Sequence, residues 1–142
     1  MKPPPELPTL FLDRNLGKHI VSARLRDAGV HVEVHDDRFA IDAPDEEWIR
    51  SVARRGWVAV TRDRNLRYRA HEMNSIREHA ARVIVIRMKN ASGVAMADLL
   101  IRSLPRIAQF VAATPAPFVV AITSNGALRQ VWPLDFDDDE DA

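Results

Sequence analysis

The sequence of 142 residues contains no cysteine. Disulfide bonds, thiolate metal sites and a cysteine nucleophile are therefore excluded, and the absence fits a reducing compartment. No apolar run approaches the roughly 20 residues that a membrane-spanning helix needs. The first residues, 1–5, read Met-Lys-Pro-Pro-Pro and include no apolar segment long enough for a signal peptide. We therefore expect a soluble cytoplasmic protein without a membrane partner.

The formal net charge is zero, but the charges are unevenly distributed. Residues 135–142 hold six acids and no base, which leaves 14 acids against 20 Lys and Arg in residues 1–134, a net charge of +6. A block of like charges is either a solvated end or an interaction tail, and a basic body favours an anionic partner. We expect one domain over residues 1–134, without internal repeats, followed by an acidic disordered tail over 135–142.

Strand and helix patterns alternate along the domain. Short apolar runs predict strands over 9–12, 30–34, 57–61, 82–87 and 118–123, and periodic patterns predict helices over 16–28, 45–56, 70–79 and 95–113. The segment 35–39 is expected to be a loop, and 64–69 a basic loop. This order is typical of an α/β fold with a mostly parallel sheet, in which the carboxyl ends of the strands face one crevice.

Several single residues refine this pattern. Asn15 is a good N-cap for the first helix, which should bury Ile20 and Ala23. Asp42 or Asp45 should cap the second helix. Two further expectations concern the C-terminal part: Pro105 should kink or split the fourth helix, and Asn125-Gly126 should turn the chain into an antiparallel return over 128–134.

Acids stand where two predicted strands end. Asp13 follows the first strand, Asp63 follows the third, and Asp45 and Glu46 begin the helix that leads into the third strand. Adjacent strands lie about 4.8 Å apart, so carboxylates at neighbouring strand ends can share one ion. Oxygen ligands without cysteine favour Mg²⁺ or Mn²⁺, ions that hold phosphates and activate water.

A basic segment surrounds the third strand's acid. Arginines with an aromatic residue among them can hold a phosphate backbone and stack a base. The other interpretation is an exposed loop whose arginines pair with nearby acids. The residues concerned are Arg62, Arg64, Arg67, Tyr68 and Arg69.

The segments 11–16, 44–48 and 60–64, read together, resemble the PIN-like nucleases, in particular short bacterial proteins related to VapC-type toxins. The resemblance covers about residues 9–87. It implies a three-layer α/β/α fold with a mostly parallel sheet and a C-terminal antiparallel hairpin. It also implies a Mg²⁺- or Mn²⁺-dependent endoribonuclease that acts on RNA. Such a protein would be the toxin of a toxin–antitoxin pair and would have an antitoxin protein as its partner. A homodimer is a further expected assembly.

By this resemblance the catalytic acids are Asp13, Asp45 and Asp63, with Glu46 as rival to Asp45 and as a further metal ligand. Arg14 joins the arginines above as a residue that binds nucleic acid. The sequence departs from the family at Asn65, where many members carry a further acid. Asp36 and Asp37 could substitute for it, or could belong to a solvated loop.

Two other functions remain open. One is a PIN-like module that binds RNA without cleaving it. The other is a phosphoacceptor signalling domain, which would need a lysine after the last parallel strand, where the sequence has Thr123-Ser124-Asn125. The five histidines show no metal-binding spacing, and surface positions are expected for them.

Overall fold

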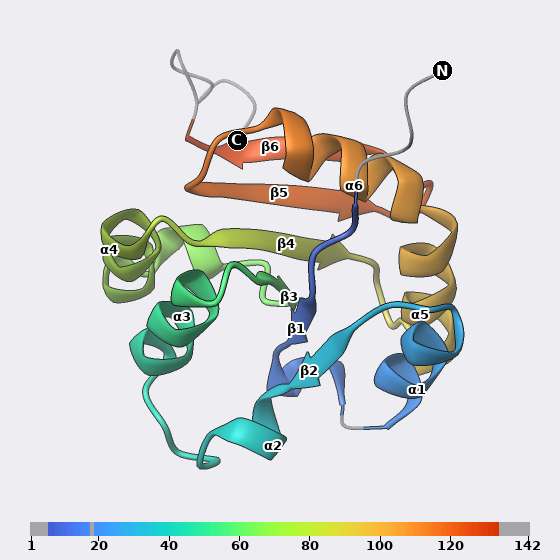
Figure 1. The fold of residues 1–142 in the computed structure, drawn as a ribbon, viewed down its shortest axis with the longest axis horizontal. Helices are drawn as coiled ribbons and strands as arrows, with labels where there is room; N and C mark the ends of the chain where they lie inside the picture. The colour runs from blue at the N-terminus through green and yellow to red at the C-terminus, as the bar shows by residue number, and fades with distance from the viewer. Residues whose placement is uncertain (1–5, 18, 134–142) are drawn as a thin grey trace.

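The computed structural model describes residues 6–17 and 19–133. Their strands form one six-stranded sheet in the order β2-β1-β3-β4-β5-β6 (Figure 1). The strands are β1 (Leu10–Leu12), β2 (Val32–Val34), β3 (Val58–Thr61), β4 (Arg82–Arg87), β5 (Phe118–Thr123) and β6 (Leu128–Trp132). The helices are α1 (Ile20–Asp27), α2 (His35–Arg38), α3 (Asp45–Arg54), α4 (Ala70–His79), α5 (Gly93–Arg102) and α6 (Leu104–Ala113), with 3-10 turns η1 (Arg14–Leu16) and η2 (Leu66–Tyr68).

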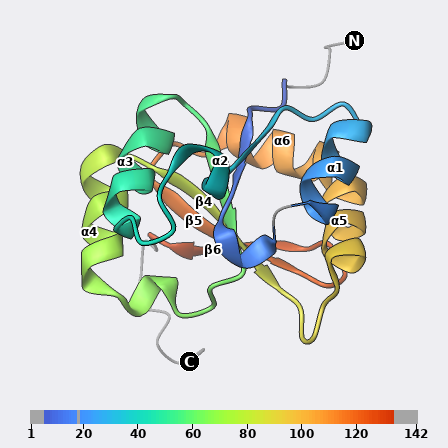
Figure 2. The same cartoon turned by 90° about the horizontal axis from the view of Figure 1, so that it is seen from below.

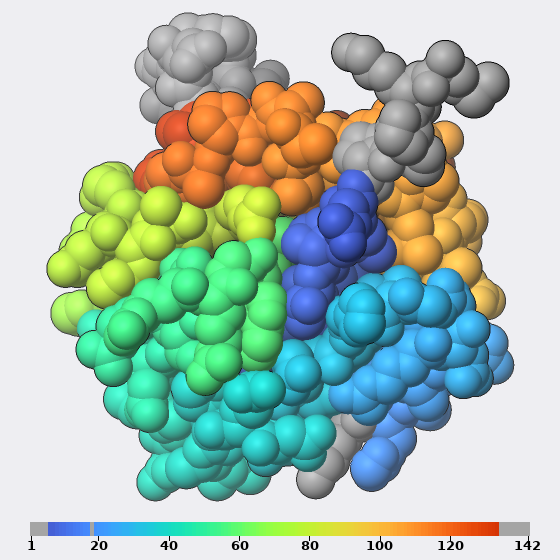
Figure 3. Space-filling model, in the orientation of Figure 1, coloured from blue at the N-terminus to red at the C-terminus, as the bar shows by residue number. Residues whose placement is uncertain are grey.

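Helices cover both faces of the sheet. One buried cluster joins α1, α5 and α6 to the face that carries Leu10 and Leu12, and a second joins α3 and α4 to the face that carries Phe11. Figure 2 shows α3 and α4 on one side of the sheet and α1 and α5 on the other. In the space-filling view, α3 and α4 form one continuous surface (Figure 3). The residues of the central strands β1, β3 and β5 are almost all buried on both faces, as is typical of parallel sheets, and the predicted three-layer α/β/α fold is confirmed.

The strand directions confirm the predicted topology. Strands β1 to β5 are parallel to their neighbours, and β6 alone is antiparallel to β5. The predicted turn at Asn125-Gly126 makes this return, with Gly126 at φ +86°. The last residue of the expected 128–134 return and the whole of the tail 135–142 lie outside the described residues. The domain boundary at residue 134 therefore stays a prediction.

The first helix differs from the prediction of one helix over 16–28. Residues 14–16 form η1, Gly17 follows at φ +79°, and α1 begins only at Ile20. The chain turns early because the Asp13 carboxylate accepts the backbone N–H of Arg14, which makes Asp13 the cap of η1. Asn15 is therefore not the cap of α1. Ile20 and Ala23, predicted to be buried, are exposed, and α1 buries Val21, Ser22 and Leu25 instead.

Three further expectations need adjustment. The segment expected as a loop over 35–39 contains the short helix α2, and His35, expected at the surface, is 2% exposed. Its ring packs against Phe11 and Phe39. Neither Asp42 nor Asp45 caps α3, whose N-cap is Pro44.

The break predicted at Pro105 is confirmed. The long helix divides into α5 and α6 at Ser103, and Pro105 lies in the first turn of α6, where its missing N–H costs no hydrogen bond. No helix in the described part of the chain is long and apolar enough to cross a bilayer.

Candidate functional site

The acids predicted from the strand ends lie at one edge of the sheet. Strand β1 pairs with β3, with Leu12 opposite Val60, so Asp13 directly follows the strand that neighbours β3. The backbone N–H of Asp13 donates to the Val60 carbonyl at 2.9 Å, which continues the ladder by one residue. This is the carboxyl edge, where open parallel sheets bind ligands.

Thr61, the last residue of β3, links the two strand-end acids. Its hydroxyl donates to Asp13 Oδ2 at 2.8 Å and accepts the backbone N–H of Asp63 at 3.1 Å. It also accepts Asn15 Nδ2 at 3.0 Å, so the buried hydroxyl uses its donor and both acceptor positions. The Asn15 carbonyl in turn accepts the backbone N–H of Arg62 at 3.2 Å. Asn15 thus ties η1 to the segment after β3.

The half-buried carboxylate of Asp13 is surrounded by hydrogen-bond donors and charges that change its pKa. Its Oδ1 accepts the Arg14 N–H at 2.7 Å. Burial raises the pKa of Asp13, and the Asp45 carboxylate adds to the rise, whereas the hydrogen bonds from Thr61 and Arg14 and the charge of His35 oppose it. Asp45 is therefore close enough for its charge to act on Asp13. The start of α3 thus contributes a charge that acts on the acid after β1.

Asp45 is held in place by a neighbour on its own helix. As the first residue of α3, it accepts the indole N–H of Trp48 at 3.0 Å, and the indole ring is buried in the sheet-facing core. Asp45 and Glu46, its rival from the sequence, are both exposed on this turn. They differ in that the charge of Asp45 acts on Asp13.

Asp63 is engaged on both oxygens. Oδ1 accepts the backbone N–H of Asn65 at 3.1 Å, and Oδ2 forms an ion pair with Arg69 Nη1. Asn65 therefore contributes a backbone contact to the site. In the described residues, no three His, Asp or Glu side chains are arranged to hold one metal ion.

The sequence interpretation missed Glu72, which lies in the first turn of α4. Burial raises the pKa of Glu72, a hydrogen bond with Asp45 and the charge of that carboxylate raise it further, and the Arg69 guanidinium opposes the rise. Glu72 follows Arg69 by three residues, a helical spacing that could have indicated a shared location. Nothing in the sequence indicates that α4 approaches the start of α3.

The arginines expected to bind nucleic acid divide into separate groups. Arg14 donates to the Ile41 carbonyl at 3.2 Å and lies 3.4 Å from Asp36, so it holds the segment after α2. Arg69 pairs with Asp63. Arg62 is half-buried beside Asn15, while Arg64 and Arg67 lie near Arg87, as described below.

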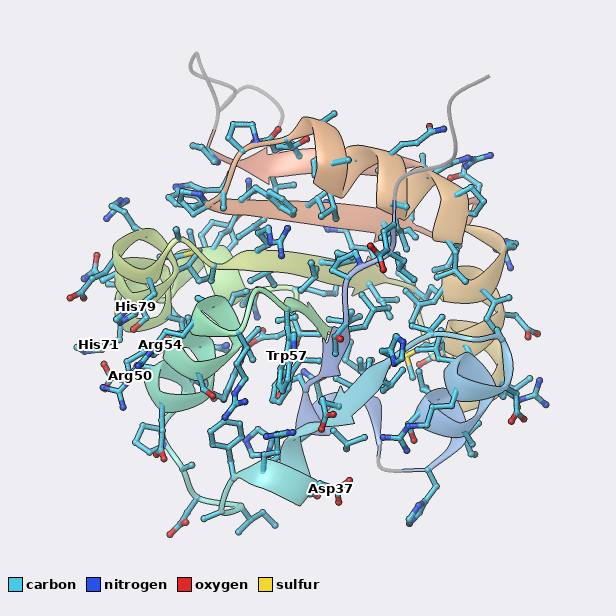
Figure 4. All side chains as sticks on the ribbon, viewed as in Figure 1. Asp37, Arg50, Arg54, Trp57, His71 and His79 are labelled. Atoms are coloured by element: carbon cyan, nitrogen blue, oxygen red, sulfur yellow. The ribbon has the colours of Figure 1, made fainter. Side chains whose placement is uncertain are left out.

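The acids considered as substitutes, Asp36 and Asp37, belong to α2. Asp36 forms an ion pair with Arg14, and its Oδ1 lies within hydrogen-bond distance of His35 Nδ1, at 3.1 Å. Asp37 is exposed on α2, at the periphery of the view in Figure 4. In the view of Figure 4, His71 and His79 of α4 and Arg50 and Arg54 of α3 lie at the left margin of the molecule.

Comparisons with known proteins identify the family of the chain. The family described as "PIN like domain" matches residues 8–88, which include all the predicted acids. The chain is 30% identical over 128 residues to the Mycobacterium tuberculosis protein named "Putative ribonuclease VapC45", a match that covers 87% of this chain and 92% of the relative. No solved structure matches. The chain therefore belongs to the PIN-like domain family and is related to the VapC-type ribonucleases.

Proposed function

We propose that this protein is a metal-dependent endoribonuclease that acts in the cytoplasm as the toxin of a toxin–antitoxin pair. Family membership and the ribonuclease name of the relative support a nuclease. The observation that carries the proposal is the linkage of Asp13 and Asp63 through the Thr61 hydroxyl, with Asp45 acting on Asp13. In this proposal, the three acids come from separate segments and act together at the sheet edge where open parallel sheets bind ligands.

The chemistry of these side chains fits a hard divalent cation. Asp13, Asp45 and Asp63 offer carboxylate oxygens, the ligands that Mg²⁺ and Mn²⁺ prefer. A cation would offset both causes that raise the pKa of Asp13, its burial and the charge of Asp45. When bound, such an ion stabilises negative charge on a phosphate and lowers the pKa of a nearby water. Glu46 or Glu72 would supply a further oxygen beside Asp45.

Asp63 needs to change partner for this role. Its Oδ2 is paired with Arg69, so we propose that Arg69 turns from Asp63 to an RNA phosphate when a cation and substrate bind. An arginine can make this exchange because its guanidinium binds carboxylate and phosphate in the same geometry. Arg14, Arg62, Arg64 and Arg67 would supply the remaining phosphate contacts.

The substitution Asp13→Asn tests the proposal. The amide keeps the size of the side chain and can still accept the Thr61 hydroxyl, but it removes the charge that holds a cation. We expect RNA cleavage in Mg²⁺ or Mn²⁺ to fall to the level seen with a chelator, as measured on an end-labelled RNA. Asp37→Asn, an exposed change on α2, is the matched control and should cleave as wild type does. Equal rates for Asp13→Asn and wild type would show that the acid is not catalytic.

A second function has a specific observation in its favour. The pairing of Asp63 with Arg69 and the absence of a three-ligand group among the described residues suit a module that binds RNA without cleaving it. The same experiment separates the two functions. Wild-type protein that binds RNA but leaves it intact in either metal would favour the binding module.

The proposed partner is a cognate antitoxin protein. In a toxin–antitoxin pair, co-expression of the antitoxin should restore growth that the toxin alone arrests, and Asp13→Asn should remove the arrest. Normal growth on expression of the wild-type chain alone would argue against a toxin. A homodimer stays a prediction that size-exclusion chromatography with light scattering would test.

A further inference from the structure

Two arginines that the sequence interpretation did not single out lie beside the basic segment after β3. Arg87 ends β4, opposite Thr123 at the carboxyl end of β5, and Arg129 lies opposite Ala121 on β6. Arg87 follows Val83 and Val85 at intervals of two residues along β4, so its side chain lies on the same face of the sheet. This is the face covered by α3 and α4. Because Ala121 belongs to the same face, Arg129 projects to this side as well.

An open hollow lies between the end of β4 and the two residues that precede η2. It has a volume of about 490 Å³ and is lined by Arg64, Asn65 and Arg87. A side-chain hollow of this size, open to solvent and walled by guanidinium and amide groups, suits a charged, hydrated group. It does not suit an apolar ligand.

An exposed aromatic ring borders the arginines. Tyr68, in η2, is 68% exposed. The Arg67 guanidinium lies 4.9 Å from the ring centroid and donates to the Tyr68 hydroxyl at 2.7 Å. These contacts hold the ring in place. Arg67 Nε is buried and has no hydrogen-bond partner among the described residues, so it retains an unused donor.

The arginines repel one another. Burial lowers the pKa of Arg87, and the charges of Arg67, Arg64 and Arg129 lower it further. Like charges at close range are unfavourable, most of all where they are partly removed from water. An anion placed among the guanidinium groups would reverse this penalty, because each would then face an opposite charge.

We propose that Arg64, Arg67, Arg87 and Arg129 form a subsite for the phosphates of single-stranded RNA, with Tyr68 stacking on a base of the same strand. Four guanidinium groups from β3–η2, β4 and β6 suit a chain of phosphates, and one exposed ring suits unpaired bases. The inference rests on the proposed function for the route of the strand: Arg64 directly follows Asp63, so RNA bound here leads to the acids. The proposal therefore places the bound RNA on the side of the acids where Arg64 follows Asp63.

Binding can be measured without catalysis. The probe is a fluorescein-labelled 12-nucleotide single-stranded RNA, with anisotropy recorded in a metal chelator over a range of salt concentrations. Arg87→Gln and Arg129→Gln should each weaken binding roughly 3- to 10-fold at low salt and reduce the salt slope by about 0.7 per lost phosphate contact. Tyr68→Ala should weaken binding about 5-fold or more, with little change in slope, because stacking releases no counterions.

Matched variants control for charge and folding. Arg54→Gln, on the outer side of α3 (Figure 4), makes the same charge change away from the hollow and should bind RNA as wild type does. Arg87→Lys keeps the charge and should retain most of the affinity, which separates lost binding from a disturbed β4. Thermal unfolding of each variant checks the fold.

Because binding is measured without metal, these results test the subsite independently of whether the protein cleaves RNA. Loss of affinity in Arg87→Gln and Arg129→Gln, with Arg54→Gln unchanged, supports the subsite even if wild-type protein cleaves no RNA. If all three glutamine variants lose the same affinity, binding depends on net charge alone and the subsite is rejected. Unchanged binding in all three rejects it as well.

Discussion

At the scale of single residues, the site depends on a hydroxyl. Thr61 is 1% exposed and bonds to groups of Asp13, Asn15 and Asp63 through one oxygen atom. A valine of nearly the same shape would leave a buried carboxylate oxygen, an amide and a backbone N–H each without this partner. The geometry of two acids therefore rests on a neutral side chain between them.

We predict that Thr61→Val lowers the free energy of unfolding by about 1–3 kcal/mol, because buried polar groups lose their partner. Urea denaturation followed by circular dichroism measures the change. Thr61→Ser keeps the hydroxyl and should lose less stability than the valine variant. If valine and wild type unfold at the same urea concentration, the hydroxyl does not hold the acids.

Asp13 gives a second prediction at this scale, from its raised pKa. Its folded pKa lies above the ordinary value of 3.8, so the ionised form is less favourable in the fold than in the unfolded chain. The resulting loss of stability is absent below the unfolded pKa and grows as pH rises through the folded pKa. The single amide oxygen of Asn cannot accept both the Thr61 hydroxyl and the Arg14 N–H, so Asp13→Asn loses one hydrogen bond at every pH. Because it cannot ionise, it should nevertheless become more stable relative to wild type as pH rises towards 7.

The difference between the two proteins as a function of pH reports the ionisation of the Asp13 carboxyl. Chemical denaturation at a series of pH values from 7 to about 3.5 is the measurement, and the pH-dependent gain of Asn should disappear near the acid end, below the unfolded pKa. A stability difference that does not change with pH would mean that Asp13 ionises as readily in the fold as in the unfolded chain.

At the scale of elements, the alternation of strands and helices and the sheet's carboxyl edge could be predicted from sequence, because apolar runs and helical periods are local. The placement of Asp13 and Asp63 follows from that topology. What could not be predicted depends on contacts between distant segments. Asn15 fits an N-cap by residue type, yet its side chain binds Thr61, 46 residues away. Glu72 reaches Asp45 only because α4 packs on α3, which no local pattern shows.

The turn between β5 and β6 illustrates such a distant contact. Arg106 of α6 donates to the Gly126 carbonyl at 3.0 Å, and a Cβ on Gly126 would lie 3.0 Å from Arg106 Nη1 and 3.2 Å from Ser103 Oγ. The sequence predicted both the turn and the break near Pro105. The contact that joins them was not predictable.

We predict that Gly126→Ala destabilises the fold by about 1–2 kcal/mol, from the positive φ together with the close approach to α6. Gly56→Ala is the matched control, because Gly56 has φ +73° with nothing within 4 Å of an added Cβ. Urea denaturation of both variants should show the larger loss for position 126. Equal losses would mean that the turn is not packed tightly on the helix junction.

At the scale of the whole molecule, charge is divided between the body and residues 135–142. These residues lie outside the described structure, but their six acids cancel the +6 of the rest of the chain. Long-range attraction of RNA depends on this sum where salt is low, because the Debye length is about 30 Å at 0.01 M and about 8 Å at 0.15 M.

A chain that ends at Leu134 should therefore bind single-stranded RNA more tightly than the full chain at low salt, and the difference should shrink as salt rises. Anisotropy of a labelled RNA with both proteins, in a chelator, gives the comparison. If the two affinities agree at 0.01 M salt, the acidic residues are a solvated end without influence on binding.

The antiparallel direction of β6 has a practical consequence. Strand β1 begins, and β6 ends, at the amino edge of the sheet, since Trp132 lies opposite Val119 near the start of β5. The acids lie at the other edge. Attachment of the protein to a sensor surface through the amino edge of the sheet should therefore leave Asp13 and Asp63 facing the flowing solution, which suits kinetic measurements with RNA.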